Sequence, residues 1–573
     1  MPAAATQSAR GLTPSTIRIG RRYRPQRLEQ GYDAIVIGSG IGGLTTAASL
    51  SRVGKKVLVL EQHYTAGGMT HSYSRNGYEW DVGVHYIGEV GSRRSVTRRL
   101  FDFVTDGALE WAPMDANYDR FFIGRERFDV VAGKKNFVAS LKKRFPGEEE
   151  AIDEYMRRMG KVGKAVQAIS VEKTVGGLAG KLLRLGRKLT LPAYVNRTTY
   201  EVLRELTDNE MLIAVLTGQW GDSGVSPKDS SFMIHCLIAN HYLHGAYYPV
   251  GGASRMAETI IPVVQRGGGE VFTYANVEEI LIRRGVVRGV KMADGTEIEA
   301  PVVISNAGVF NTFGRLLPAA VSKKHGYHKR AQSVTPSIGH LGVYIGLQES
   351  AEALGLPRTN LWIYPDANHR ENLAAFKADY RKPFPAVYIS FPSAKDPSWD
   401  SRYPNTATIE IVAPAYFETF ARWQEQPWGK RGEDYDALKN HFTERLLEHL
   451  FAHFPQLRGK IDYCELSTPL STDFFCAYKR GEMYGLTHDT GRFEQQWLRP
   501  KTSIKGLYLT GQDIMTCGVG GAMAGGFMCA LSVLGVKSPA LLRAFAAGPG
   551  TAPTPGDYSL APVSSATRGQ HPD

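Results

Sequence analysis

The chain has 573 residues, of which 43% are hydrophobic and 22% are charged. This length exceeds what one hydrophobic core supports, so we expect a globular protein with two or three lobes. The five cysteines are odd in number and show neither a C-x-x-C pair nor a metal-binding spacing to histidine. They exclude a disulfide scaffold and predict no metal site. The formal net charge of +12 is compatible with nucleic acid, an anionic membrane or basic tails.

Both ends of the chain have the composition of disordered segments. Residues 1–30 form a basic arm with six arginines against one acid, Glu29, and residues 546–573 are rich in Ala, Gly, Pro and Ser. The arm lacks the apolar run of a secretory signal, so an organelle transit peptide and a disordered leader both remain open. Reduced cysteines predict an intracellular protein, either cytoplasmic or peripheral on a membrane.

Residues 33–61 contain every part of a dinucleotide-binding unit. Apolar runs at 34–37 and 57–60 predict two buried strands, and a helical stretch at 44–53 lies between them. Glu61 follows the second strand, where a carboxylate can accept hydrogen bonds from ribose hydroxyls. An acid at this position favours FAD or NAD over NADP.

The turn between the first strand and the helix reads Gly38-Ser39-Gly40-Ile41-Gly42-Gly43, a G-x-G-x-x-G motif. Gly38 permits a tight turn, Gly40 lets the backbone approach a pyrophosphate, and Gly43 lets the helix pack close to the strand. The helix N-terminus offers free N–H groups and a positive dipole end to the phosphates. The sequence therefore predicts dinucleotide binding here.

Two further motifs follow Glu61. Gly67-Gly68 again permits close approach of the backbone to a ligand, and residues 77–86 read Gly-Tyr-Glu-Trp-Asp-Val-Gly-Val-His-Tyr. With Glu61, this arrangement resembles the flavoprotein oxidoreductases related to phytoene desaturase and monoamine oxidase. The amino-acid sequence of residues 60–88 looks most like that of the retinol saturase and carotenoid isomerase branch. The resemblance covers roughly residues 31–540 and implies FAD as the cofactor.

Residues 161–197 carry eight lysines and arginines against one acid, Glu172. Within this stretch, residues 175–189 mix apolar and basic residues in the manner of an amphipathic helix on an anionic membrane. A solvated basic helix is the alternative. The stretch lacks interleaved aromatic residues and the chain shows no nucleic-acid motif, so we expect no nucleic-acid partner.

The middle of the chain resembles the same family again at Tyr247-Tyr248-Pro249-Val250-Gly251-Gly252. A helix is expected at 253–266, and the residue at the position of Val277 packs near the adenine in relatives. Strands are expected at 271–273, 277–282, 286–292 and 302–305, then at 342–347, 386–391 and 406–412, with helical patterns at 417–423 and 435–454.

The closing unit pairs a strand at 506–510 with Gly511-Gln512-Asp513. Gly511 and Asp513 match the Gly-x-Asp element of the family, whose carboxylate binds a ribityl hydroxyl. A helix starting near Gly520 and Gly521 is expected to point its N-terminus at the flavin.

Residues 514–536 are uncharged and long enough to span a membrane. They contain six glycines after a strand and turn, so we expect a buried helix and no transmembrane span.

These motifs predict an α/β fold class. A Rossmann-like FAD-binding domain is built from residues 31–100, 246–310 and 496–545. An α+β substrate and membrane-facing domain, with a mixed sheet and helices, is built from residues 101–245 and 311–495.

The implied chemistry is hydride transfer at flavin N5 to or from a carbon–carbon double bond of an apolar, isoprenoid, carotenoid or retinoid-like substrate. Saturation, desaturation and isomerisation remain open. A proton must also move, and His85, Tyr248 and Tyr484 are weak candidates, since each also fits a packing role. Because only one nucleotide motif is visible, the electron partner is expected to be external: a quinone, oxygen or a reductase. An amine-oxidase-like flavoenzyme and a non-enzymatic prenyl-binding or lipid-binding protein are the two alternatives.

Overall fold

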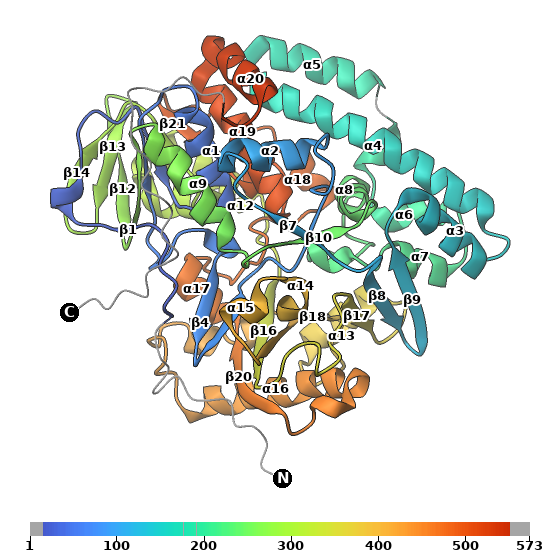
Figure 1. The fold of residues 1–573 in the computed structure, drawn as a ribbon. Coiled ribbons are helices and arrows are strands. Elements are labelled where there is room, and N and C mark those ends of the chain that lie inside the picture. The colour runs from blue at the N-terminus through green and yellow to red at the C-terminus, as the bar shows by residue number, and fades with distance from the viewer. Residues whose placement is uncertain (1–14, 176, 191, 551–573) are drawn as a thin grey trace.

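A computed structural model describes residues 15–175, 177–190 and 192–550. The predicted tail beyond 550 and residues 1–14 of the arm lie outside the described residues. Figure 1 shows a sheet domain carrying β12–β14 and α9, a second sheet domain carrying β16–β20, and a group of helices around α4 beside both.

The first domain is built on a parallel sheet of six strands. Their order is β1 (Arg21–Arg22), β11 (Glu270–Thr273), β3 (Val57–Leu60), β2 (Ala34–Ile37), β15 (Val303–Ser305) and β21 (Leu507–Leu509). The central strands are apolar because a parallel sheet is covered on both faces. The helices α1 (Ile41–Ser51), α2 (Val96–Thr105), α9 (Arg255–Arg266) and α19 (Gly518–Leu534) contribute to one core. The antiparallel strands β12 (Val277–Arg283), β13 (Val286–Met292) and β14 (Glu297–Glu299) contribute to the other core.

The basic arm is ordered where the structure describes it, so the expectation of disorder over residues 1–30 is wrong for residues 15–30. Strand β1 pairs in parallel with Phe272 and Thr273, and the Tyr23 N–H donates to the Thr273 carbonyl over 2.9 Å. The edge of β11 that does not face β3 supplies the partners for these backbone hydrogen bonds, and the exposed arginine side chains of β1 do not interfere with them. At the other end, α20 (Ser538–Ala547) extends past the predicted domain boundary at 545.

The second domain contains a mixed sheet of seven strands. Their order is β20 (Ile461–Ser467), β16 (Gly339–Leu347), β19 (Ala407–Ala415), β18 (Val387–Ser390), β17 (Asn360–Tyr364), β8 (Asn117–Ile123) and β9 (Glu126–Val131). Strands β17 and β8 are parallel, and the other neighbours are antiparallel. The long helix α16 (Glu433–His453) shares a core with this sheet.

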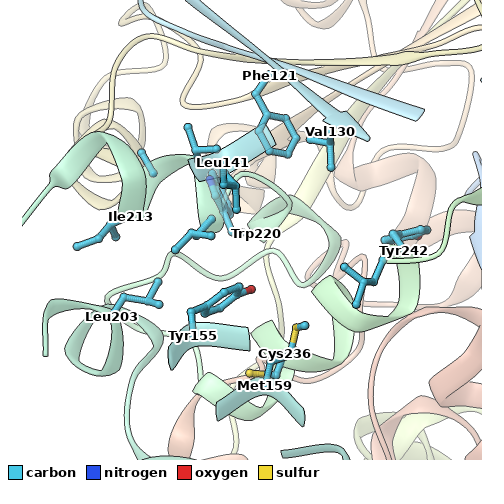
Figure 2. Close-up of a cluster of buried hydrophobic side chains, with 14 of the residues drawn as sticks. Phe121, Val130, Leu141, Tyr155, Met159, Leu203, Ile213, Trp220, Cys236 and Tyr242 are labelled. Atoms are coloured by element: carbon cyan, nitrogen blue, oxygen red, sulfur yellow. The ribbon is translucent and has the colours of Figure 1, made fainter. Parts of the chain in front are cut away.

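A helical group packs against the β8–β9 end of that sheet. It comprises α3 (Lys134–Arg144), α4 (Glu149–Val175), α5 (Gly177–Thr190), α6 (Thr199–Arg204), α7 (Glu210–Leu216) and α8 (Phe232–Tyr242). Figure 2 shows its core, where Tyr155 and Met159 of α4 lie with Cys236 of α8, and Phe121 of β8 lies near Val130 of β9. The amphipathic helix predicted at 175–189 is therefore present as α5.

Short elements complete the chain. Strands β6 (Ile87–Gly88), β10 (Ala246–Pro249) and β7 (Trp111–Pro113) form a small sheet between the domains, and β4 (Ser72–Arg75) pairs with β5 (Tyr78–Asp81). The remaining described α-helices are α10 (Gly308–Asn311), α11 (Ala319–Lys324), α12 (Tyr327–Gln332), α13 (His369–Ala378), α14 (Pro392–Lys395), α15 (Trp399–Arg402), α17 (Pro469–Cys476) and α18 (Thr490–Glu494).

One helical stretch among the described residues, Gly518–Ala547, is long and apolar enough to cross a membrane by length and composition. Its first part, α19, packs closely on α1: the Thr46 hydroxyl lies 3.1 Å from the Gly526 carbonyl, and a Cβ at Gly526 would come 2.5 Å from the Gly42 carbonyl oxygen. Residues 518–534 thus belong to the dinucleotide-binding domain, where the sequence placed a buried helix.

Candidate active site

A cavity of about 900 Å³ has walls from both domains. On one side it is lined by the G-x-G-x-x-G turn, the end of β3, the Gly67-Gly68 pair and the start of α19. On the other side it is lined mainly by aromatic and aliphatic side chains of the sheet and helices of the second domain. The walls therefore combine a nucleotide-binding part with an apolar chamber.

Most of the residues predicted to bind the cofactor meet in this cavity although they come from distant parts of the chain. The predicted residues that line it are Gly38, Gly40, Glu61, Gly67, Gly68, Val277, Asp513, Gly520 and Gly521. Gly43 and Gly511 are absent from its wall and lie behind it. Their role in holding a cofactor stays a prediction, but the fold brings the whole set together.

Gly43 and Gly511 serve close packing around one side chain, Asn306, which follows β15. A Cβ at Gly43 would lie 2.3 Å from the Gly38 carbonyl oxygen, and one at Gly511 would lie 2.3 Å from Asn306 Oδ1. The Asn306 amide also lies 2.8 Å from a Cβ built at Gly40. Asn306 therefore occupies space that only glycines leave open, and it joins the first and last segments of the domain.

Two carboxylates in the wall are positioned by backbone N–H groups. Glu61 Oε2 accepts from the Ser39 N–H (2.8 Å) and hydroxyl (2.7 Å), and Oε1 accepts from the His63 N–H over 2.8 Å. Asp513 Oδ2 accepts from the Val309 N–H over 2.8 Å, whereas Asp513 Oδ1 is buried without a hydrogen-bond partner. Each carboxylate thus keeps acceptor capacity for a ligand hydroxyl.

Helix α19 begins at Gly518, two residues earlier than the sequence indicates, and Gly520 and Gly521 lie in its first turn. The N-terminal N–H groups of a helix and its dipole favour negative charge. Residues Gly518 to Ala522 line the cavity, so this end of α19 can stabilise an anion that develops on a bound ring.

The chamber beyond the nucleotide part is lined chiefly by apolar side chains. Trp362 of β17 and Tyr388 of β18 lie with ring centroids 4.6 Å apart, and Tyr86 stacks on Tyr242 at 4.2 Å. The aliphatic part of the wall comprises Ile234, Leu237, Ile238, Ile338, Val412 and Met483. These side chains suit a long apolar molecule and leave few groups that could bind a charged one.

His85, a predicted proton-transfer candidate, lines the cavity between the two parts. Its Nδ1 lies 2.8 Å from Glu410 Oε2. Burial lowers the pKa of His85 to about 3 and raises the pKa of Glu410 to about 8. At neutral pH the imidazole of His85 is therefore neutral and Glu410 is a neutral carboxylic acid, so the pair carries no charge.

The two predicted tyrosines differ in placement. Tyr248 is 2% exposed, does not line the cavity, and donates its hydroxyl hydrogen to Asp81 Oδ2. This position favours the packing role of Tyr248 over the proton-transfer role, which stays a prediction. Tyr484 does line the cavity, but its hydroxyl donates to the Gly221 carbonyl over 3.1 Å.

Sequence reasoning missed several polar residues of the wall: Tyr86, Asp222, Asn306 and His340. Asp222 lies in a short 3₁₀ turn, Trp220–Asp222, within a stretch that carries no recognisable spacing. The signal for Asn306 was present, because it directly follows a buried strand and precedes Ala307-Gly308. The polar residues of the chamber come from separate elements, and only the tertiary structure brings them together.

Comparison with known proteins agrees with this architecture. Residues 36–104 match a family model described as an NAD(P)-binding Rossmann-like domain. Cyclohexylamine oxidase from Brevibacterium oxydans superimposes with a TM-score of 0.56 at 14% identity, over 90% of this chain and 100% of that one. The predicted α/β fold class, with a Rossmann-like domain and a mixed α+β domain, is confirmed.

The sequence relatives are more specific. The all-trans-retinol 13,14-reductase of Danio rerio is 39% identical over 531 residues, 89% of this chain and 87% of that protein. The chloroplastic prolycopene isomerase of Arabidopsis thaliana is 27% identical over 87% of this chain and 82% of that protein. The resemblance to the retinol saturase and carotenoid isomerase branch is thereby confirmed. This chain is an oxidoreductase with a dinucleotide-binding domain, and it belongs to the family of the all-trans-retinol 13,14-reductases.

Proposed function

We propose that this protein binds FAD and saturates a carbon–carbon double bond of a retinoid or a similar isoprenoid polyene. One observation carries the proposal: a single cavity joins the predicted nucleotide-binding residues to a chamber walled by aromatic and aliphatic side chains. A reductase is favoured over an isomerase because the retinol reductase is the more similar relative, at 39% against 27% identity.

The residues present fit FAD. The α1 N-terminus with Gly38 and Gly40 would hold the pyrophosphate, Glu61 the adenosine ribose, and Val277 the adenine. The partnerless Asp513 Oδ1 would accept from a ribityl hydroxyl, and the start of α19 would face the flavin ring. When bound, FAD supplies hydride transfer at its N5 atom.

The chain's own contribution is to position an apolar substrate and exclude water. The chamber walls carry few ionised groups, since burial keeps the His85–Glu410 pair uncharged. A dry, apolar chamber protects a reduced cofactor from side reactions and strengthens any polar contact made within it. Electrons are proposed to come from an external donor such as a quinol or a reductase, because the sequence shows only one nucleotide motif.

The decisive experiment is to purify the protein, identify any released flavin, reduce the protein anaerobically with dithionite, and add all-trans-retinol. The proposal expects stoichiometric FAD, and reoxidation by retinol with a product that has gained two hydrogens. Retinoids with the bond already saturated serve as the matched negative substrates.

Three results would overturn the proposal. A protein that folds and binds retinoid but no flavin is a lipid-binding protein. Reduction of the oxidised flavin by amines, without reaction of polyenes, indicates an amine oxidase. Conversion of cis to trans polyenes without a gain of hydrogen indicates an isomerase.

We further propose that the mouth of the cavity sits on an anionic membrane. Helices α4, α5 and α20 lie near one another along one edge of the molecule (Figure 1), and the Ser532 hydroxyl, at the end of α19, donates to the Thr174 carbonyl over 3.2 Å. This edge carries an apolar patch of exposed side chains: Val171, Val175, Leu182, Leu183, Leu185, Val536 and Leu542. Val171 both lines the cavity and is 52% exposed, so the cavity opens beside the patch.

Charge supports this orientation. The exposed cations Lys181, Lys537 and Arg543 lie in the same segments as the apolar patch, and clustered basic residues attract anionic lipid headgroups. Sedimentation with phosphatidylglycerol-containing vesicles should pull down the wild type, and pure phosphatidylcholine should pull down less. The double variant Leu182→Gln/Leu185→Gln should lose binding, whereas Phe474→Gln, a change at a 54% exposed apolar residue of α17 that does not line the cavity, should not. Equal binding of all three proteins would contradict the proposal.

A further inference from the structure

The hydroxyl of Tyr86 lies between two carboxyl groups. Its oxygen is 3.2 Å from Asp119 Oδ2 and 3.1 Å from Asp222 Oδ2. Asp119 is fully buried at the start of β8, whereas Asp222 is partly exposed and lines the cavity. The three groups form a short polar chain that leads from the cavity wall into the core.

A count of hydrogens shows that this chain holds an extra proton. A phenol has one hydrogen to donate, so it can serve only one of two ionised carboxylates. The second carboxylate would then face an oxygen lone pair, with a like charge nearby in a buried site. Protonation of one carboxyl group removes both the repulsion between like charges and the unpaired lone pair. The protonated group then donates to the phenol oxygen, and the phenol donates to the other carboxylate.

The extra proton belongs on Asp222 rather than on Asp119. Asp119 accepts from the amides of Asn360 (2.9 Å) and Gln219 (2.8 Å), which stabilise its ionised form. Lys395 donates to the Asn360 carbonyl oxygen, which fixes the amide that donates to Asp119. Among the described contacts, the Asp222 side chain accepts only from Tyr86. Burial, with repulsion from Asp119, raises the pKa of Asp222 to about 8.

The other titratable groups that face Asp222 do not compensate its charge. They are the thiol of Cys517 and the phenols of Tyr118, Tyr242, Tyr364, Tyr388 and Tyr484. Burial raises the pKa of each, so all of them are neutral near pH 7. Asp222 therefore stays a neutral carboxylic acid at the surface of an apolar chamber.

We propose that the Asp222 carboxyl group is the proton donor of the reaction. This inference rests on the proposed function, in which bound FAD, when reduced, would supply a hydride for one alkene carbon. The other alkene carbon takes the proton of Asp222: the O–H bond breaks, its electron pair stays on the carboxylate, and two C–H bonds replace the π bond. Tyr86 then donates to the new Asp222 carboxylate and stabilises it.

The first test needs no catalytic activity. Infrared spectra of the purified protein should show the carbonyl stretch of a protonated carboxylic acid that disappears as the pH rises through about 8. The buried Glu410 also carries a proton, with a pKa of about 8, so the assignment rests on difference spectra. The difference between wild type and Asp222→Asn should contain a carboxylic-acid band, and the difference between wild type and Asp208→Asn, a change at a 93% exposed carboxylate, should not. Identical carboxylic-acid bands in wild type and Asp222→Asn overturn the assignment.

The second test measures reoxidation of the dithionite-reduced protein by retinol in a single turnover. Asp222→Asn should slow this step by about 100-fold or more, the usual contribution of a general acid, while FAD content and retinoid affinity stay within threefold of wild type. The wild-type rate should fall above pH 8, and the variant should lack that fall. Normal reoxidation by the variant overturns Asp222 as donor, whereas failure of the wild type to react with polyenes overturns the proposed function instead.

Discussion

Replacement of Asp513 by alanine should weaken FAD binding and also destabilise the cofactor-free protein. In the structure Asp513 Oδ2 accepts from the Val309 N–H, and Oδ1 is buried without a partner. A hydrogen bond to a charged group contributes about 1.5–3 kcal/mol. Since about 1.4 kcal/mol corresponds to a tenfold change in affinity, loss of the Oδ1 contact should raise the FAD dissociation constant roughly 10- to 150-fold.

The second effect of this substitution is independent of FAD. Alanine leaves the buried Val309 N–H without its acceptor, which costs about 1–3 kcal/mol of folding free energy. Asp513→Asn is the matched control, because its amide oxygen can still accept from Val309. Flavin-fluorescence titration of apoprotein measures the affinity, and urea unfolding measures the stability. If Asp513→Ala binds FAD within threefold of wild type, Asp513 serves only to hold Val309 and the ribityl assignment is refuted.

Three further predictions follow from the same contacts. Gly43→Ala places a Cβ 2.3 Å from the Gly38 carbonyl oxygen. The variant should lose about 1–3 kcal/mol of folding free energy in urea unfolding and bind FAD more weakly. Gly54→Ala is the control: its Cβ has open space although φ is 77°, so FAD affinity should stay unchanged. Lys395→Met removes a buried donor to the His85 carbonyl (3.0 Å) and the Ser390 hydroxyl (2.7 Å). The free energy of unfolding in urea should fall by about 1–3 kcal/mol. An unchanged urea midpoint would contradict this expectation. Because the pKa of Asp222 is raised on folding to about 8, its contribution to stability is present below pH 4 and is lost as the pH rises through 8. The melting temperature of Asp222→Asn minus that of wild type should therefore increase between pH 5 and pH 9. A difference that stays constant over this range would show that Asp222 does not titrate.

The sequence was most informative where backbone geometry determines residue type. At some positions a close backbone approach or a ligand contact permits only one or two residue types. The examples are the glycines at 38, 40 and 43 and the acids at 61 and 513, and the fold brings all five together. Most strands of the first sheet, and β16, β18 and β19 of the second, were also predictable, because their apolar runs are short and bounded by turns. Strands β8, β9, β17 and β20 of the second sheet were missed.

The chamber could not be predicted in the same way. Tyr86, Asp119 and Asp222 belong to three separate elements, and their proximity depends on the packing of the helical group against the seven-stranded sheet. The aromatic residues of β17 and β18 were visible in the sequence, but any buried strand carries such residues. Strand β1 was missed because its two exposed arginines lack the apolar pattern of a buried strand.

The order of strands in the six-stranded sheet has a consequence for biosynthesis. Strands β1, β2 and β3 leave the ribosome early, but β15, the neighbour of β2, follows only after more than half of the chain has been made, and β21 comes from residues Leu507–Leu509. At about 5–20 residues per second, the edge of β2 stays unpaired for roughly 13 to 53 seconds. The helix whose N-terminus lines the cavity, α19, emerges last of all the parts that line it. A cofactor bound in this cavity can therefore be loaded only after α19 has been made, so it cannot protect the unpaired strands of the nascent chain.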